Sequence, residues 1–560
     1  MYSALILTLS AVVVKIIGAF FKIPIGKILG GLGNSYFEAA YALYHPVEAL
    51  AAAGLPVAVS RTVSENIVKK RYRDAKLVYK VSVPIFLATG TICFLVMLFV
   101  TFWYTDLINS PNAKFACLAL SPTVLFSCLM SIYRGYYQGL SNMIPTAISE
   151  IIEAISKVVF GLGFANLFMR ISMSEFAAKG TVFGKICSSC EIAENEALPI
   201  AAMGAIFGIT LGSFLGFLFL LIRHKKVGDG ITSQDLAFSP IPMKAKHMIK
   251  SLVKIAVPIA FGALIMNLGG LVDTIIIRRQ LYKIMNDFSQ PLLKMYGDNI
   301  PQDKIVSQEV HSFISGCLGY VSSIVMLVPG VIQMLGISAL PAVTKAWTLK
   351  NFLRLEKSIK IIIKITTIFV VPAGVGLFTF GHSILNLFYS NTRTSEVNIA
   401  SGIMTTMSIA TIFTAMSVSV CSMLQAIGKV KLTMLLICIG TVIKIIVNYI
   451  LVGIPTINIK GAGIGSFFCY SFVFFCGLYF LFKECRINIK TSISIFLKPT
   501  CASVFSAFLC STIYKNIEPI LSKNNSTIFV LFSFVIIYIS LLFFFGIINF
   551  QNLKKIKDKI

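Results

Sequence analysis

Long apolar segments recur along this 560-residue chain, and they limit what it can fold into. A segment of about 20 apolar residues is long enough to cross the hydrocarbon core of a membrane. Because the backbone must satisfy its own hydrogen bonds in lipid, each such segment is predicted to be a helix. Only 13% of the residues are charged, against about 25% in soluble domains. The predicted fold class is an all-α polytopic membrane protein.

Hydropathy predicts about fourteen transmembrane helices. Pro24 and Gly26 are expected to break the first of them near its outer end. The predicted spans are residues 4–28, 34–62, 78–104, 113–138, 143–169, 197–222, 252–277, 312–342, 358–380, 397–425, 432–454, 461–482, 492–514 and 526–549.

Two pairs of similar segments indicate an internal duplication. Residues 46–61 and 329–345 both carry Leu-Pro, a few small residues, a hydroxyl and a terminal cation. A Gly-Ala pair with a second glycine four positions after the first stands at both 204–208 and 461–465. Many transporters are built from duplicated bundles. We therefore predict two pseudo-symmetric six-helix lobes plus two appended helices.

The predicted domains follow from this duplication. They are an N-lobe of spans 1 to 6, a cytoplasmic linker, a C-lobe of spans 7 to 12, and a hairpin of the last two spans with a basic cytoplasmic tail. Their bounds are 1–223, 224–250, 251–484 and 485–560. Lys and Arg gather in the loops after even-numbered spans, so the positive-inside rule predicts that both termini are cytoplasmic.

The net charge of +26 has two interpretations. Most of the excess is explained by positive-inside topology and by contact with anionic membrane lipids. The rest lies inside predicted spans, where an ionisable side chain costs at least about 2.5–3.5 kcal/mol and normally faces a wet cavity or a partner. The cations in question are Lys15, Lys22, Lys27, Lys157, Arg278, Arg279 and Lys444.

If these cations converge, they line a strongly basic cavity. Lys and Arg are good donors to phosphate, so we predict them as binding residues for a polyanion such as a diphosphate headgroup. Gating or coupling roles are predicted for one cation that ends the second span and for three acids, namely Arg61, Glu150, Glu153 and Asp273.

Two of these groups have structural alternatives. Glu153 and Lys157 lie at i and i+4, so they can neutralise each other as an ion pair or form a cavity wall or relay. Arg278 and Arg279 can reach lipid headgroups from the outer end of the seventh span or line a cavity.

Several kinds of chemistry have no motif here. The sequence lacks a phosphate-binding Gly-x-x-x-x-Gly-Lys-Ser/Thr loop and a metal-binding His-Glu-x-x-His. We expect no catalytic residue, no resident cofactor or metal and no nucleic acid partner, with a coupling ion, H⁺ or Na⁺, left open. Cys187 and Cys190 in a polar loop could form a small disulfide or bind a metal.

Several stretches together resemble a known group of membrane proteins. The similar stretches are Lys15–Pro24, Gly54–Arg61, Tyr133–Gly139, Pro145–Ser149 with Ile152-Glu153, Ala256–Ile259, Asp273-Thr274 and Leu340–Val343. They resemble the multidrug/oligosaccharidyl-lipid/polysaccharide exporter superfamily, in the branch of stage V sporulation protein B and the lipid II flippases. The similarity covers about twelve spans, and the Arg-Gly-Tyr-Tyr-Gln-Gly run is its most specific part.

This resemblance implies two lobes around a cavity with alternating access, and an appended helix pair that helps to form a groove for a lipid tail. It implies outward movement of an undecaprenyl-diphosphate-linked saccharide, most specifically lipid II, across the bacterial cytoplasmic membrane. Lys15 and Lys27 align with family arginines. Where the family has an arginine pair late in the second span, Ala49-Leu50-Ala51 stand here, so other lipid-linked glycans stay open.

Two further functions are alternatives. One is a cation-coupled multidrug or metabolite antiporter from the related multidrug extrusion branch. The other is a non-transporting scaffold that binds enzymes of envelope synthesis.

Overall fold

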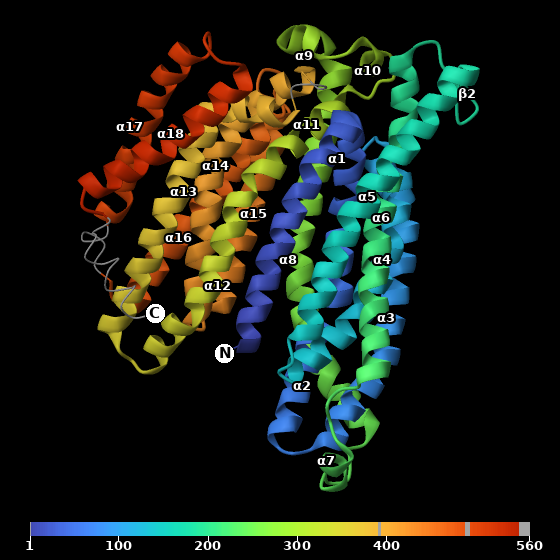
Figure 1. Cartoon of the computed structure of the whole chain (residues 1–560), viewed down its shortest axis with the longest axis vertical. Coiled ribbons are helices and arrows are strands. Elements are labelled where there is room, and N and C mark those ends of the chain that lie inside the picture. The colour runs from blue at the N-terminus through green and yellow to red at the C-terminus, as the bar shows by residue number, and fades with distance from the viewer. Residues whose placement is uncertain (1, 390–393, 488–492, 548–560) are drawn as a thin grey trace. The chain divides into compact units, whose positions relative to one another are not determined.

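The computed structural model of the chain consists almost entirely of helices, as the apolar segments predict (Figure 1). It describes residues 2–389, 394–487 and 493–547. The first half contains α1 (Tyr2–Glu48), the π-helix η1 (Ala49–Ala53), α2 (Gly54–Val68), α3 (Tyr72–Leu107), the 3₁₀ turn η2 (Pro111–Ala113), α4 (Lys114–Gly139), α5 (Ile144–Lys179), the paired strands β1 (Thr181–Val182) and β2 (Lys185–Ile186), α6 (Cys190–Val227), α7 (Ser233–Ala237) and α8 (Ala245–Asp287).

The second half continues with shorter connecting helices and then long ones. Its elements are α9 (Ser289–Tyr296), η3 (Gly297–Asn299), α10 (Gln302–Val306), α11 (Val310–Val325), α12 (Leu327–Thr348), α13 (Phe352–Tyr389), α14 (Thr394–Ala426), α15 (Val430–Val452), α16 (Lys460–Cys485), α17 (Ile493–Ile517) and α18 (Lys523–Phe544).

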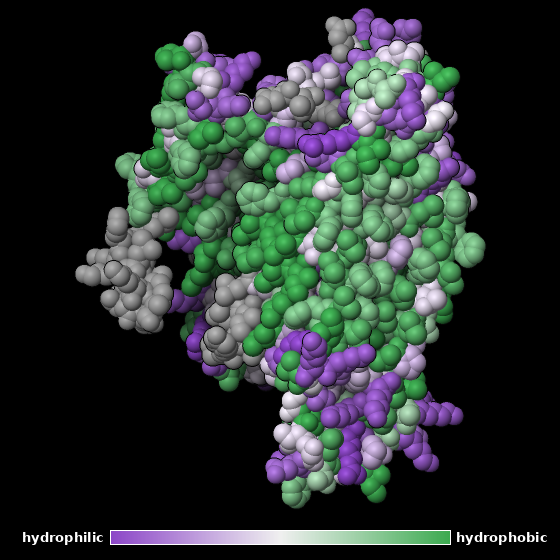
Figure 2. All heavy atoms as spheres, turned by 45° about the vertical axis from the view of Figure 1, so that its right-hand side comes forward, coloured by the Kyte–Doolittle hydropathy of each residue, from purple (hydrophilic) through white to green (hydrophobic). Residues whose placement is uncertain are grey.

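Among the described residues, twelve helices are long and apolar enough to cross a membrane. They coincide with predicted spans 3 to 14, so the class of all-α polytopic membrane protein is confirmed. The first two predicted spans fall on α1, η1 and α2. Hydrophobic side chains cover the middle of the face shown in Figure 2, and hydrophilic ones gather at its two ends. The basic tail at 554–559 lies outside the described residues.

The break in α1 lies at Gly30 rather than at Pro24 or Gly26, so that prediction was wrong. Gly30 has φ 62° and ψ −176°, which separates two helices joined end to end. Glycine reaches this conformation because it has no Cβ. Pro24 stays inside the helix, as prolines in transmembrane helices often do when neighbouring groups satisfy the freed carbonyl.

The chain divides into two compact units. Unit 1 is Met1–Asn286 with Ile300–Gly319, and unit 2 is Asp287–Asn299 with Tyr320–Ile560. The helix α8 therefore packs with the first six spans, although the duplication assigns it to the C-lobe. The predicted lobes are defined by sequence order and the units by packing, so the lobe boundaries stay a prediction.

Glycines let the last helix of each predicted repeat approach its neighbour. In unit 1, a Cβ on Gly208 of α6 would collide with the backbone of Gly161 in α5. In unit 2, a Cβ on Gly465 of α16 would collide with the side chain of Asn448 in α15. In both repeats, the matched glycine thus allows two helices to come into close contact.

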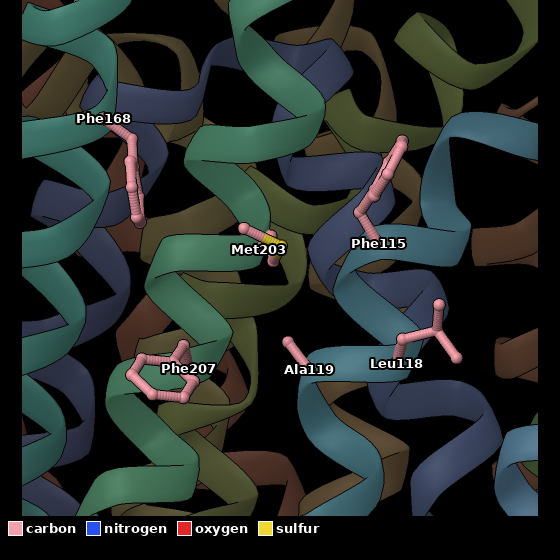
Figure 3. A pocket seen from close by; sticks show the side chains of 6 residues that line it. All are labelled: Phe115, Leu118, Ala119, Phe168, Met203 and Phe207. Carbon is pink, nitrogen blue, oxygen red and sulfur yellow. The ribbon is translucent and has the colours of Figure 1, made fainter.

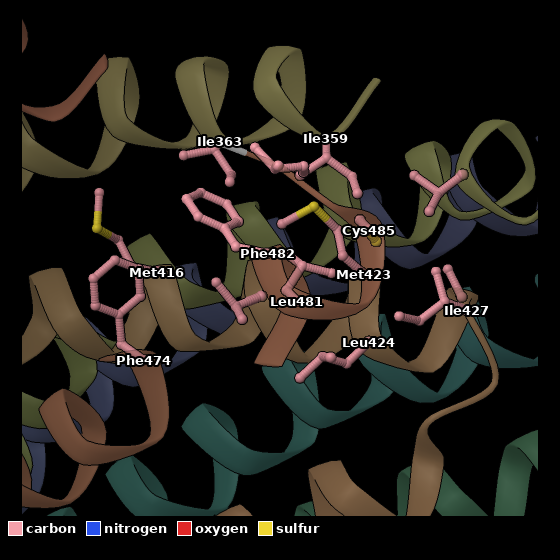
Figure 4. Packing of buried hydrophobic residues seen from close by; sticks show 14 of the residues in the cluster. Ile359, Ile363, Met416, Met423, Leu424, Ile427, Phe474, Leu481, Phe482 and Cys485 are labelled. Carbon is pink, nitrogen blue, oxygen red and sulfur yellow. The ribbon is translucent and has the colours of Figure 1, made fainter. Parts of the chain in front are cut away.

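Unit 2 has a large apolar core formed by α12, α13, α14 and α16 (Figure 4). Ile359 and Ile363 of α13 meet Met423 of α14 and Phe482 of α16 within this cluster, and all four are at most 4% exposed. Such a core fixes the four helices as one body, because interiors at this packing density have little room to rearrange.

The most family-specific motif of the sequence binds the loop after α6 to the end of unit 1 that is predicted to face the cytoplasm. Tyr136 donates its hydroxyl to Asp229 Oδ2 at 2.8 Å, and Tyr137 donates to the carbonyl of Gly228 at 3.1 Å. Arg73 of α3 donates to the carbonyl of Leu236 in α7 at 3.0 Å. Two tyrosines of the Arg-Gly-Tyr-Tyr-Gln-Gly run therefore anchor the linker.

Candidate functional site

A set of charged side chains lies inside unit 1, on α1, α4 and α5; we call it the mid-span cluster. Its first part is an ion pair between Lys22 and Glu38, whose side chains meet across the turn at Gly30. Lys22 Nζ lies 3.4 Å from Glu38 Oε1, and both side chains are about one-third exposed, at 39% and 34%. The turn at Gly30 brings these residues of α1 together although 16 positions separate them.

Lys157 of α5 is the second member, and it reaches the same part of α1. Its Nζ donates to the hydroxyl of Tyr41 at 3.0 Å. The ammonium also lies 5.0 Å from the ring centroid of Phe21 and 5.3 Å from that of Tyr41. Cation–π contact of this kind stabilises a partly desolvated ammonium by about 1–2 kcal/mol.

The third member is the ion pair between α4 and α5. Arg134 Nη2 donates to Glu153 Oε2 at 3.0 Å, and its Nε donates to the hydroxyl of Ser149 at 3.0 Å. Ser213 of α6 donates to the other carboxylate oxygen of Glu153 at 2.9 Å. Of the two interpretations of Glu153 and Lys157, the structure does not form the i,i+4 ion pair, since Glu153 pairs with Arg134. Three helices meet at this carboxylate.

Glu150 lies one turn before Glu153, and it accepts a hydrogen bond from Ser10 Oγ at 3.3 Å. Since Ser10 belongs to α1, this contact joins the first helix to α5. The side chain of Glu150 is half-buried. Both predicted acids of α5 therefore belong to the mid-span cluster.

Arg278 of α8 is buried elsewhere in unit 1, with 1% of the residue exposed. Its Nη2 donates to the backbone carbonyl of Ser35 at 2.6 Å. Within the part of the chain that the structure describes, its Nε and Nη1 are buried and have no hydrogen-bond partner. A buried cation with unsatisfied donors costs the folded protein up to several kcal/mol.

The remaining predicted residues are spread more widely. Lys15 and Lys27 are exposed on α1, and Arg279 is exposed on α8. Arg61 is exposed on α2 and donates to Glu65 Oε1 at 2.9 Å. Asp273 is buried in α8 with 8% exposed, and Lys444 is half-buried in α15 of unit 2.

A polar cavity of about 660 Å³ opens at the end of unit 1 that is predicted to face outward. Three carboxylates, Asp106, Glu196 and Glu309, are among its lining residues, with amide side chains between them. Glu309 Oε1 accepts a hydrogen bond from the Tyr36 hydroxyl at 2.7 Å and another from Asn112 Nδ2 at 2.9 Å. We call this set of contacts the outer junction.

Apolar cavities also open on the helices. One of about 380 Å³ is lined by α4, α5 and α6, where Phe115, Phe168 and Phe207 surround Met203 (Figure 3). Another of about 410 Å³ in unit 2 lies between α13, α14 and the appended helix α17, with Phe378 and Phe508 in its wall. Both suit a hydrocarbon chain and neither suits a charged group.

Sequence reasoning missed four residues of these sites. Glu38 and Arg134 lie inside predicted spans, so the same search for ionisable residues would have found them. Tyr41 had no signal, since a tyrosine is common in a membrane helix. Glu309 lies in a loop, where an acid is ordinary, and only the fold buries it against α1.

The cysteine pair of the polar loop holds no bond in the structure. Cys187 and Cys190 are free. Cys187 packs with Val182, Ala193 and Ala197 in a small core around the hairpin, whereas Cys190 is exposed. Among the described residues, no group of three or more His, Cys, Asp or Glu side chains is placed to hold a metal ion.

Comparison with known proteins gives consistent matches. The model described as polysaccharide biosynthesis protein matches residues 2–187, and the MatE model matches residues 311–450. The lipid II flippase MurJ of Bacillus subtilis (strain 168) is 23% identical over 453 residues, which cover 79% of this chain and 75% of the relative. The stage V sporulation protein B of the same organism is 22% identical and covers 99% of this chain and 96% of its own length.

Solved structures are similar in fold. A lipid II flippase MurJ in an inward closed conformation has a TM-score of 0.62 at 15% identity and covers 97% of this chain and 100% of its own. An inward-facing multidrug resistance MATE family transporter has a TM-score of 0.58 at 17% identity, and the match covers 84% of this chain and 95% of the transporter.

A bundle of helices that are long and apolar enough to cross a membrane defines a multi-pass α-helical membrane protein. The sequence matches indicate which group of membrane proteins the chain resembles. Together, the two family models and the two relatives support the multidrug/oligosaccharidyl-lipid/polysaccharide exporter superfamily, in the branch of the lipid II flippase and the stage V sporulation protein B.

Proposed function

We propose that this protein is a flippase for a lipid-linked saccharide that carries a diphosphate. It moves its ligand from the inner to the outer leaflet of the bacterial cytoplasmic membrane by alternating access, with both termini in the cytoplasm. The peptidoglycan precursor lipid II is the ligand that we favour, because two relatives are named for lipid II flipping and for sporulation.

Arg278 is the observation that carries this proposal. A buried guanidinium with Nε and Nη1 unpaired is costly to the folded protein. A diphosphate accepts bidentate hydrogen bonds from such a fork, so binding of the ligand would offset that cost. The lysines of the same unit, Lys15, Lys22, Lys27 and Lys157, supply further positive charge for the phosphates.

The lipid tail needs an apolar surface, and the cavity between α13, α14 and α17 offers one. Its wall contains Val504 and Phe508 of α17, the first of the two appended helices. Because bilayer hydrocarbon is as apolar as this cavity, the tail is held there by van der Waals packing and not by transfer out of water. We assign the tail to this cavity, in accord with the groove that the family resemblance implies.

The test is outward movement of a labelled lipid-linked precursor. The purified full chain is reconstituted in vesicles, and the label in the outer leaflet is read by a membrane-impermeant enzyme or quencher. Faster movement than in empty vesicles is the expected result. Movement no faster than in vesicles that contain an unrelated membrane protein would refute the proposal. Native mass spectrometry of the purified protein would identify the bound glycan.

The antiporter alternative is supported by the MatE match over residues 311–450. A pump for cationic drugs would use acidic residues, and Glu150 and Glu153 of the mid-span cluster are candidates. Efflux of a cationic dye in a pump-deficient strain separates the two functions. Dye efflux without lipid movement would favour the antiporter.

A further inference from the structure

Glu309 is a carboxylate that the proposed function leaves without a role. It stands between α10 and α11, and it accepts two hydrogen bonds on the same oxygen, Oε1. The donors come from two other parts of unit 1, Tyr36 of α1 and Asn112 of η2. The second oxygen, Oε2, can therefore carry a proton without loss of either bond.

The contacts around Glu309 close the outer end of unit 1. Asn34 Nδ2 donates to the backbone carbonyl of Gly316 in α11 at 3.0 Å. A Cβ on Gly316 would collide with the carbonyl of Gly31, so the two helices are in backbone contact there. Arg278 binds the next turn of α1 through Ser35. The outer ends of α1, α8 and α11 are thus joined within a few residues of Glu309.

Glu309 nevertheless has access to water, because it lines the polar cavity of about 660 Å³. The charged and titratable side chains around it come from six helices. They are Tyr36 of α1, Asp106 of α3, Glu196 of α6, Tyr282 of α8, Lys304 of α10 and His311 of α11. Lys304 is itself paired with Asp303 at 3.0 Å. The carboxylate is therefore held by neutral donors and faces other acids.

We propose that Glu309 is a proton-binding site, which takes up a proton from the outer side as α1 and the start of α11 come together. Separation of these helices returns the carboxyl to water and releases the proton. The proposal rests on the alternating access of the proposed function and adds to it a proton-dependent closure of the outer end. Proton uptake at closure would accompany the return of the empty flippase.

The chemistry of the site selects a proton over a sodium ion. Tyr36 and Asn112 both point hydrogens at Oε1, whereas Na⁺ requires several oxygen acceptors around it. The described residues also contain no cluster of three acids, histidines or cysteines placed for a metal.

Burial agrees with this assignment. It raises the pKa of the Glu309 carboxyl above its ordinary value, although the hydrogen bonds from Tyr36 and Asn112 act in the opposite direction. A carboxyl that binds its proton more tightly when buried favours the closed junction at low pH and the open junction at high pH.

Spin labels across the junction test the proposal in the full chain, in nanodiscs and without ligand. Lys114→Cys at the start of α4 and Val306→Cys at the end of α10 carry the labels. The exposed Cys190 and Cys501 are replaced by serine. As the pH falls from about 8 to about 5, a range in which buried glutamates titrate, the population of the short distance should rise.

Variants decide whether Glu309 causes that response. Glu309→Gln keeps an oxygen for both donors and cannot ionise, so it should stay closed at every pH. Asp106→Asn, which removes an exposed acid of the same cavity, should respond like the wild type. Tyr36→Phe removes a donor that favours the ionised form, so its midpoint should move to higher pH, and this variant also serves if Glu309→Gln does not fold.

Three outcomes would overturn the proposal. They are a wild type that does not respond to pH, a Glu309→Gln protein that responds like the wild type, and a response to Na⁺ at constant pH in place of one to protons. Because no ligand is present, these results do not depend on which lipid the protein moves. Failure of the vesicle assay with an intact pH response would instead count against the proposed ligand.

Discussion

The mid-span cluster and the outer junction are both polar regions of unit 1, but they treat charge in opposite ways. In the mid-span cluster, Glu38 faces Lys22 and Glu153 faces Arg134. In the outer junction, Glu309 accepts hydrogen bonds from two neutral donors, Tyr36 and Asn112, and near it Arg278 donates to the backbone carbonyl of Ser35. The mid-span cluster pairs its acids with cations, whereas at the outer junction Glu309 and the nearby Arg278 are bonded to neutral groups.

This difference separates structural charges from functional ones. A paired charge stabilises the fold that contains it, and removal of one partner leaves the other uncompensated. An unpaired buried charge destabilises the fold, so its retention requires another reason, such as a ligand or a proton. Variants in the two regions should therefore differ in whether they lose stability or activity.

The largest effect is expected at Arg278. Arg278→Met keeps the volume of the side chain and removes a buried cation whose Nε and Nη1 have no partner among the described residues. Replacement of buried charges by apolar residues is often neutral or stabilising, by about 1–4 kcal/mol. We expect lipid movement to fall by more than about tenfold, the equivalent of 1.4 kcal/mol, without a lower melting temperature.

Vesicle transport and thermal unfolding of the same purified sample check this prediction. Arg279→Met is the matched control, because Arg279 is the next residue and is exposed. It should lose much less transport. A large loss of stability in Arg278→Met would show that the guanidinium stabilises the fold, as Arg134 is expected to do.

The next effect is expected at the pair Arg134–Glu153, and it is a loss of stability. Arg134→Ala leaves Glu153 with the hydrogen bond from Ser213 and without its cation. The two side chains are 20% and 28% exposed, so water compensates in part, and we expect a loss of about 1–3 kcal/mol.

A double-mutant cycle measures this loss by chemical unfolding. Addition of Glu153→Ala to Arg134→Ala should restore part of the stability, because the uncompensated carboxylate is gone. If the double variant is as unstable as the sum of the two single variants, the residues do not interact, and the mid-span cluster is not built from paired charges.

Glu309 should give a smaller effect that depends on pH. Burial raises the pKa of its carboxyl, so the folded state binds more protons than the unfolded state between the ordinary and the raised value. Stability is then greatest below this window and falls as the pH rises through it, by at most about 1.4 kcal/mol per pH unit. When the free energy of unfolding is measured across this pH range, it should fall with rising pH in the wild type and not in Glu309→Gln. A slope of opposite sign would contradict the burial of an uncompensated acid.

The sequence predicted the helices well because each span is a local property. Twelve of the predicted spans coincide with helices that the structure finds long and apolar enough to cross a membrane. The break at Gly30 was misplaced, because proline signals a kink only when the surrounding helices do not compensate for it. Hydropathy does not report that compensation.

Which charges meet was much harder to predict. The search for ionisable residues within spans found Lys22, Lys157 and Glu153, but it could not say which side chains each of them contacts. Glu153 pairs with Arg134 across two helices, not with Lys157 one turn away. Such partners depend on the rotation of whole helices, and a shift of one residue turns a side chain by about 100°. A single sequence does not specify that rotation.

The smallest effect on stability is expected at Arg61, a predicted gate residue outside both regions. Its side chain is 65% exposed and pairs with Glu65, four positions later on α2. Exposed pairs at this spacing contribute about 0.3–0.5 kcal/mol, so Arg61→Gln should unfold almost like the wild type, and so should the control Glu65→Gln. Vesicle transport then decides the role of the charge itself. If Arg61 is a gate residue, Arg61→Gln slows lipid movement while Glu65→Gln does not, because only the first variant removes the cation. Equal transport in all three proteins would make Arg61 an ordinary surface cation and would leave the functional charges of unit 1 to its buried residues.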